Sequence, residues 1–138
     1  MALNPASTSS PIRTVFNSSQ VYKGYSLNGS LDLGPDMTGS LQGILLRFRE
    51  NLVVAQGDIK KMYYAVRVTK QEEMMQLYMW KFKGEHKIRT YAMTRLVMGN
   101  KSSANSSQTA LKETAVLGDC KEKFPEAATA LIDYSYVR

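Results

Sequence analysis

The chain has 138 residues and a mass of 15.5 kDa, which is room for one compact domain with an apolar core and excludes two of ordinary size. Hydrophobic residues make up 43% and charged residues 22%, and these near-average values exclude a wholly disordered or fibrous chain. The net charge is +6, which favours an anionic partner such as nucleic acid or a phosphate.

The cysteine content and the hydropathy of the sequence limit the cellular compartments in which we expect the protein. Cys120 is the only cysteine, so an intrachain disulfide and a cysteine zinc cluster are excluded. The N-terminal residues lack the basic and apolar regions of a signal peptide, and no apolar run reaches the roughly 18 residues of a membrane helix. We therefore expect an intracellular protein, cytoplasmic or nuclear, with no membrane partner.

Residues 1–28 are predicted to form a leader, a strand and a loop. Residues 1–11 are small, polar and bounded by proline, which predicts a flexible leader, and the remaining residues 12–138 are expected to form the folded domain. Residues 12–16 alternate apolar and polar side chains and predict a strand. A polar stretch at residues 17–28 predicts an exposed loop.

A helix and a buried strand are predicted next. Gly-Pro-Asp at residues 34–36 is a turn with a helix N-cap at its end, and apolar residues then recur at helical spacing, so we expect a helix over 37–50. The β-branched run at 52–55 predicts a short buried strand that places Asp58 at its C-terminal end, where α/β folds often carry chemistry.

In the C-terminal half, predicted strands and helices do not alternate regularly. Residues 63–68 predict a further strand and 69–75 a turn of helix, and 77–83 and 88–93 predict an antiparallel hairpin. Helices are expected from Ser102 to about Gly118 and from Pro125 to about Leu131, because Gly favours helix ends and Pro favours helix starts. The fold class is therefore α+β, an antiparallel-leaning sheet packed with helices.

Positive charge is concentrated between Lys81 and Lys101. That stretch holds one acid, Glu85, and six cations: Lys81, Lys83, Lys87, Arg89, Arg95 and Lys101. Aromatic residues are interleaved with the cations, and such a mixture can hold phosphates while stacking bases. The alternative is a solvated hairpin whose aromatic side chains face inward.

Asp58 is the one acid placed as a catalytic carboxylate would be, after Gly57 and before two lysines. The alternative is a helix N-cap for the turn that follows. Metal-dependent phosphoryl chemistry needs two or three converging carboxylates, and no second acid is evidently placed to join Asp58. The only histidine, His86, is expected to be an exposed loop residue, and Cys120 an ordinary thiol.

Several segments in a fixed order carry a family resemblance. They are RTVFNSS, YSLNGSLDLGPDM, SLQGILLRFREN, QGDIKKMYYAVRV, LYMWKF, YAMTRLVMGNKSSANSSQTAL and FPEAATALIDYSYVR. Together, from about Ile12 to Val137, they resemble the reverse transcriptase domain of retrotransposon polyproteins, most closely the BEL/Pao group. QGDIKKM is similar to that family's first catalytic segment, and the last segment is similar to the approach to its Tyr-Val-Asp-Asp motif.

The resemblance implies a partial fingers and palm fold of an RNA-directed DNA polymerase, which uses Mg²⁺ or Mn²⁺ to add dNTPs to a primer on an RNA or DNA template. Residue roles follow by position. Asp58 would bind the metal through its carboxylate and Ile59 through its backbone carbonyl. The nucleotide would lie on Arg13, Tyr63, Met98 and Gly99, and the nucleic acid on the basic residues Lys81, Lys83, Lys87, Arg89 and Lys101.

The sequence departs from the family pattern at the metal site and at the nucleotide site. Arg138 stands where the family has the first aspartate of its last catalytic pair, and a cation there repels the metal ion. Asn17, Val97 and Ala104 replace a family Asp and two family Pro residues. We therefore expect this chain to be inactive as a polymerase unless a partner chain supplies the missing carboxylates, and a non-catalytic nucleic-acid-binding module is the alternative.

Overall fold

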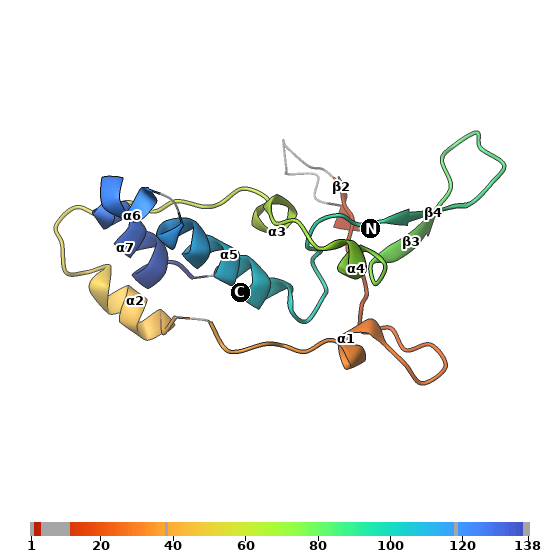
Figure 1. The fold of residues 1–138 in the computed structure, drawn as a ribbon, viewed down its shortest axis with the longest axis horizontal. Helices are drawn as coiled ribbons and strands as arrows, with labels where there is room; N and C mark the ends of the chain where they lie inside the picture. Colours follow the sequence, from red (N-terminus) through yellow and green to blue (C-terminus); the bar gives the residue numbers. More distant parts are fainter. Residues whose placement is uncertain (1, 4–11, 38, 118, 137–138) are drawn as a thin grey trace. The chain divides into compact units, whose positions relative to one another are not determined.

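The computed structural model describes residues 2–3, 12–37, 39–117 and 119–136 (Figure 1). It is a mixed α/β structure with two small antiparallel sheets, β1–β2 and β3–β4, and several helices. Its elements are β1 (Ala2–Leu3), β2 (Ile12–Arg13), α1 (Leu27–Ser30), α2 (Leu41–Arg47), α3 (Met62–Ala65), α4 (Lys70–Glu73), β3 (Leu77–Trp80), β4 (Arg89–Ala92), α5 (Ser103–Val116), α6 (Cys120–Lys123) and α7 (Pro125–Asp133).

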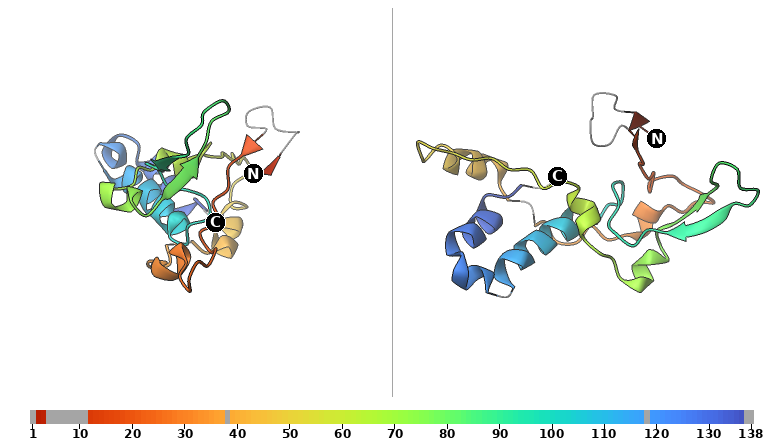
Figure 2. Two further views of the ribbon diagram at one scale, coloured as in Figure 1. Left: turned by 90° about the vertical axis from the view of Figure 1, so that its right-hand side faces the viewer. Right: turned by 90° about the horizontal axis from the view of Figure 1, so that it is seen from above.

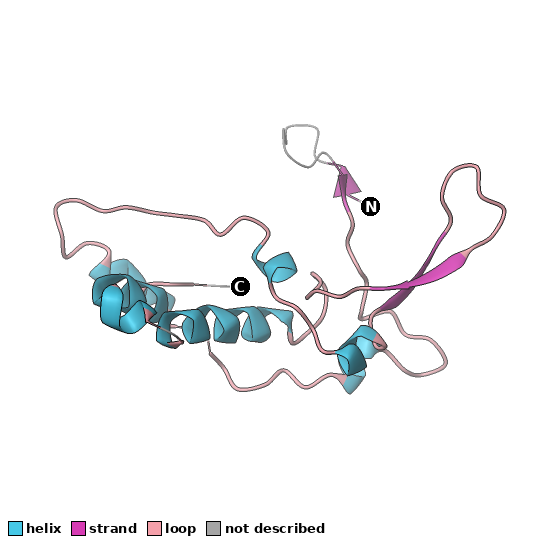
Figure 3. Ribbon diagram, turned by 45° about the horizontal axis from the view of Figure 1, so that its top comes forward, coloured by secondary structure: helices cyan, strands magenta, loops and turns pink. Residues whose placement is uncertain are grey.

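The chain divides into two compact units. Unit 1 comprises residues 1–32 and 63–103, and unit 2 comprises residues 33–62 and 104–138. All the described strands belong to unit 1, whereas most of the helical residues belong to unit 2. Figure 3 distinguishes these strands and helices by colour. No helix among the described residues is long and apolar enough to cross a membrane.

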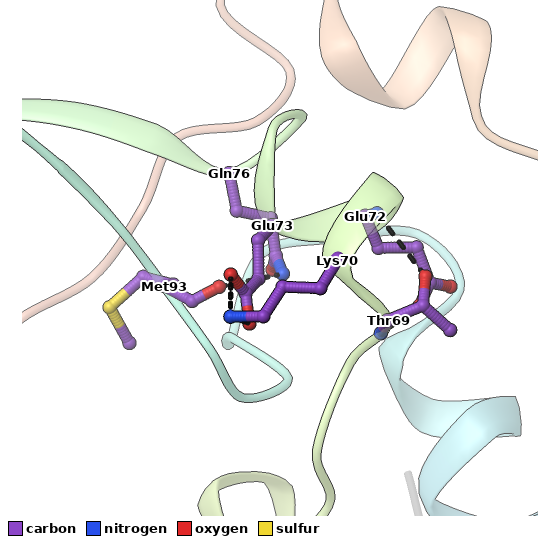
Figure 4. A network of polar contacts seen from close by, with 6 residues as sticks. All are labelled: Thr69, Lys70, Glu72, Glu73, Gln76 and Met93. Carbon is purple, nitrogen blue, oxygen red and sulfur yellow. Dashed lines mark hydrogen bonds and ion pairs between the residues drawn. The ribbon is translucent and has the colours of Figure 1, made fainter.

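The β3–β4 hairpin and the segments at its base organise unit 1 (Figures 1 and 2). Residues 66–68 run beside residues 94–96 through hydrogen bonds that include Leu96 N to the Val66 carbonyl at 3.1 Å. Leu96 and Val97 are buried here. Helix α4 precedes the hairpin and begins with a reciprocal capping box. The side chains of Thr69 and Glu72 each accept a hydrogen bond from the other residue's backbone N–H (Figure 4).

Gly99 is fixed by a close approach of two backbone segments within unit 1. Its φ of +114° lies in the region that side-chain-bearing residues rarely adopt. A Cβ added to Gly99 would overlap the Phe16 carbonyl oxygen. The loop that contains Gly99 can therefore lie against residues 16–18 only with glycine at this position.

Polar contacts tie together the helices and loops of unit 2. Arg47 donates to the Asp133 carbonyl at 2.7 Å and lies over the Tyr134 ring. Lys112 donates to the Met37 carbonyl at 2.9 Å. Among the described residues of this unit, the buried apolar side chains are Ile44, Ala115 and Ala128.

Four predicted elements are confirmed, with adjusted bounds. The helical turn at 69–75 is α4, the hairpin of 77–83 with 88–93 is β3–β4, and the helices predicted from Ser102 and Pro125 are α5 and α7. The mixed α and β content was also expected. The predicted strand 12–16 is β2, which covers only Ile12–Arg13 and pairs with β1 in the predicted leader.

The predicted strand at 52–55 is wrong. These residues form no strand, and Leu52 and Val53 are almost fully exposed, at 105% and 88%. β-branched residues favour strands only where a neighbouring strand pairs with them and a packed face covers them. No strand among the described residues pairs with this segment, so its propensity alone does not produce a strand.

Two further elements differ from prediction. Residues 63–68 contain most of helix α3 (Met62–Ala65) and one bridge, Arg67 to Arg95, instead of a strand. The helix expected over 37–50 is the shorter α2, because Ser40 caps it by accepting from Gly43 N at 3.2 Å. Within the predicted loop, Ser26 similarly caps the short helix α1.

We expect Gly99→Ala to lower the free energy of unfolding of unit 1 by about 3 kcal/mol or more, because strain and overlap with Phe16 act together. Gly84→Ala is the matched control, since Gly84 also has a positive φ, of +90°, but open space around it; backbone strain alone predicts a loss of about 1–2 kcal/mol. Urea unfolding followed by Trp80 fluorescence measures both. Equal losses in the two variants would contradict the close approach.

Candidate nucleic-acid interface

The β3–β4 hairpin presents cations around its loop. Lys81, Lys83 and Lys87 are exposed and form no ion pair with any described residue. Arg89 differs, because its guanidinium contacts the Glu85 carboxylate at 3.0 Å. The hairpin loop therefore carries three lysine charges that face water, and Arg89, at the start of β4, carries a charge that Glu85 partly neutralises.

Five rings form a continuous series of stacked and T-shaped contacts, which we call the aromatic row: Phe16, Tyr78, Tyr91, Phe82 and Trp80. Tyr78 and Tyr91 are paired across the strands and stack with centroids 5.7 Å apart. Phe16 meets Tyr78 edge-on, Phe82 meets Tyr91 edge-on, and Trp80 meets Phe82 in the same way.

Exposure changes along the aromatic row. Tyr78 and Tyr91 are half-buried, whereas Trp80 and Phe82 are 39% and 53% exposed. The alternative of a hairpin with inward-facing aromatics therefore describes only the part of the row near residue 16. At the other end, two rings lie open to solvent among the lysines, with π-faces that can stack on a planar ligand.

The residues expected to bind the nucleotide lie on separate elements of unit 1. Tyr63 is half-buried in α3, and Met98 is 42% exposed. Gly99 has a structural role, since its neighbourhood is taken by Phe16. Arg13 lies in β2 opposite Ala2, and its side chain is outside the described part of the structure. Lys101 is exposed, and its backbone N–H donates to the Asn28 carbonyl oxygen Oδ1 at 2.8 Å.

Asp58 and Ile59 lie in unit 2, in an irregular segment where both are exposed. The strand that was to position Asp58 does not form. The alternative of a helix cap also fails, because α3 begins at Met62, four positions after Asp58. Among the described residues, no three His, Cys, Asp or Glu side chains gather closely enough to hold a metal ion. The described acids therefore do not fit the two-ion site of a polymerase, and we derive no step through Mg²⁺ or Mn²⁺.

Sequence reasoning missed a network of neutral polar side chains in unit 1. Ser18 donates to the Asn100 side-chain oxygen at 2.6 Å, and Asn100 donates to the Gln76 side-chain oxygen at 2.9 Å. Gln76 is nine-tenths buried and points toward the Met93 carbonyl (Figure 4). Asn28 donates to the Gly99 carbonyl at 2.9 Å. The partners are 17 to 82 positions apart in the sequence, so no local pattern reveals them.

No protein-family model matches the chain, and no curated protein or solved structure is similar to it at a significant level.

Replacement of Asp58 tests whether this carboxylate is structurally isolated, as its exposure indicates. We expect Asp58→Asn to change the free energy of unfolding by no more than about 0.5 kcal/mol, as for surface sites without special contacts. Ile44→Ala, in the core of the same unit, is the positive control and is expected to cost about 2 kcal/mol or more. Thermal and urea unfolding followed by circular dichroism give both values. If Asp58→Asn lowers the free energy of unfolding by more than about 1 kcal/mol, the size of effect expected for a lost helix cap, the exposed placement of Asp58 is contradicted.

Proposed function

We propose that this protein binds single-stranded nucleic acid through the β3–β4 hairpin and does not itself catalyse nucleotidyl transfer. The observation that carries the proposal is the pairing, in one hairpin, of three lysines without ion-pair partners among the described residues and two exposed rings, Trp80 and Phe82. Proteins that hold single strands combine a positively charged path for the backbone with rings on which bases stack.

The lysines would supply affinity that does not depend on sequence. Lysine is a flexible, strongly hydrated point charge, and each phosphate that it neutralises releases condensed counterions from the nucleic acid. Lys81, Lys83 and Lys87 lie in or next to one loop, so a single phosphate backbone can meet all three. Binding of this kind weakens steeply as salt concentration rises.

The rings would favour single strands over duplexes. Bases in a duplex are already stacked on one another, whereas an unpaired base has a free π-face for Trp80 or Phe82. Stacking on an aromatic side chain is worth about 1–3 kcal/mol per base. An exposed ring on a water-facing hairpin otherwise costs free energy by leaving apolar surface in water.

A second proposal concerns origin. Seven segments of the sequence, in a fixed order, resemble a reverse transcriptase domain, and α5 begins at Ser103, within one of them, YAMTRLVMGNKSSANSSQTAL. We propose that the chain derives from such a domain. Under this proposal Asp58 and Ile59 are remnants of a metal site, and Arg13, Tyr63, Met98 and Gly99 are remnants of a dNTP site.

Charge reversal tests the hairpin. We expect Lys81→Glu combined with Lys83→Glu and Lys87→Glu to weaken binding to a single-stranded RNA at least about 100-fold at low salt. The slope of log affinity against log salt should fall by roughly 2 in magnitude, as three lost phosphate contacts on a single strand require. Fluorescence anisotropy across a salt series measures both quantities.

The matched control reverses three exposed lysines of unit 2, Lys60, Lys61 and Lys121, and lowers the net charge by the same amount. If the two triple variants lose affinity equally, binding responds to overall charge, and the hairpin proposal is overturned. A wild-type preference for duplex over single-stranded RNA would overturn it as well.

A primer-extension assay tests the claim about catalysis. With a primed RNA or DNA template, all four dNTPs and either Mg²⁺ or Mn²⁺, we expect no incorporation by this chain. Asp58→Ala should leave nucleic-acid affinity unchanged. Incorporation that disappears in Asp58→Ala would show instead that Asp58 supports polymerisation.

A further inference from the structure

Asn28 holds together the junction at which residues 16–18 meet residues 99–100 in unit 1. Its backbone N–H donates to the Ser18 carbonyl at 2.9 Å. Its side-chain Nδ2 donates to the Gly99 carbonyl, also at 2.9 Å. One residue therefore bonds to each of the two segments that meet there, and a change in its amide group acts directly on the junction.

The Asn28 amide is bonded at both of its polar atoms. Nδ2 donates to Ser19 Oγ at 2.9 Å as well as to the Gly99 carbonyl, and an amide NH₂ has two donors to give. Oδ1 accepts from the Lys101 backbone N–H at 2.8 Å. The folded chain therefore directs this amide toward residues that lie before and after it in the sequence, and fixes it there.

Asn28 is followed by Gly29, and this is the only Asn-Gly pair in the sequence. In such a pair the glycine nitrogen can attack the asparagine amide carbon, because glycine has no side chain to obstruct the ring that forms. The nitrogen gives its proton to solvent, the bond from the amide carbon to Nδ2 breaks, and ammonia leaves. Water then opens the succinimide ring to aspartate or isoaspartate, so the reaction consumes water, releases ammonia and needs no oxidant or reductant.

The folded structure uses both reacting groups for other contacts. The Gly29 N–H donates to Ser26 Oγ at 3.1 Å, which is the N-cap bond of α1. Asn28 lies inside α1, and its amide is bonded to residues outside that helix. The attack on the amide carbon therefore requires α1 to open and the amide to leave its partners. Its rate should follow the population of this locally open state.

We propose that Asn28 is a deamidation site that the folded junction keeps closed, and that the product prevents the junction from closing again. An aspartate carboxylate has no donor, so the Gly99 carbonyl and Ser19 Oγ lose the N–H groups that they accept from. Isoaspartate also lengthens the main chain by one carbon, which displaces the cap of α1. A local opening that lasts long enough for the reaction thus becomes permanent, whether or not the hairpin binds nucleic acid.

The first experiment compares the folded wild-type chain with the same chain unfolded in guanidinium chloride, at one mildly alkaline pH and one temperature. Mass spectrometry follows the tryptic peptide of residues 24–47, in which Asn28 is the only asparagine, and fragmentation assigns the change to it. We expect the unfolded chain to convert at least about tenfold faster, because its amide is free to react. Equal rates, or no conversion in the unfolded chain, would overturn the proposal.

The second experiment removes the cap that holds the attacking nitrogen. Loss of an N-cap raises the population of open α1 about fivefold, so folded Ser26→Ala should deamidate faster than wild type by about that factor. Ser40→Ala is the matched control, since Ser40 caps α2 of unit 2 by accepting from Gly43 N at 3.2 Å. Acceleration in both variants, or in neither, would overturn the gating. If Ser26→Ala does not fold, the comparison of folded and unfolded wild type decides.

The third experiment tests the effect of the product. We expect Asn28→Asp to lower the urea midpoint of unit 1, followed by Trp80 fluorescence, by about 0.5 M or more, because the Gly99 carbonyl loses its donor. Asn51→Asp, the same change at an exposed asparagine of unit 2, should leave the midpoint unchanged. A wild-type midpoint for Asn28→Asp, or equal losses in the two variants, would show that deamidation does not open the junction.

Discussion

The approach of Gly99 to the Phe16 carbonyl determines how unit 1 is built. Residues 16 and 99 are far apart in the chain, and only a glycine with positive φ lets their backbones meet. Hydrogen bonds from Asn28 and Ser18 secure the same junction. Closing so long a loop costs entropy, which these paired polar groups and the buried Leu96 and Val97 must offset.

The need to hydrogen-bond every buried polar group explains why the side chains at the junction of residues 16–18 with residues 99–100 are neutral. A buried charge needs a partner and carries a large desolvation penalty, whereas a buried amide needs only its hydrogen bonds. Gln76, Asn100 and Ser18 supply those bonds to one another. The exposed lysines Lys81, Lys83 and Lys87 instead lie on the hairpin loop, where water solvates them. Groups that require fixed geometry and groups that require only charge are thus separated within a single unit.

Sequence reasoning succeeded where the determining interactions are local. The capping box of Thr69 and Glu72, Pro125 at a helix start and the alternation around residues 77–93 all depend on neighbours within a few positions. It failed at 52–55, because a strand depends on a partner strand that local composition does not reveal. Because that strand does not form, Asp58 does not lie at a strand end as predicted. The network of Ser18, Gln76 and Asn100 was not predicted because its members are distant in sequence.

The candidate interface illustrates why binding is easier to infer than catalysis. Charge attraction acts over about 8–10 Å at moderate salt, so under the proposed function three solvated lysines can attract an anion even if none has a fixed position. Phosphoryl transfer has no such tolerance, because a misplacement of about 1 Å can cost about 100-fold in rate. Asp58 is an exposed carboxylate in an irregular segment, and within the described part of the chain it joins no group of side chains that could hold a metal ion. The hairpin, by contrast, holds Tyr78, Tyr91 and Trp80 on paired strands and carries Phe82 and the three lysines in the adjoining loop, and stacking and electrostatic attraction require no greater degree of order.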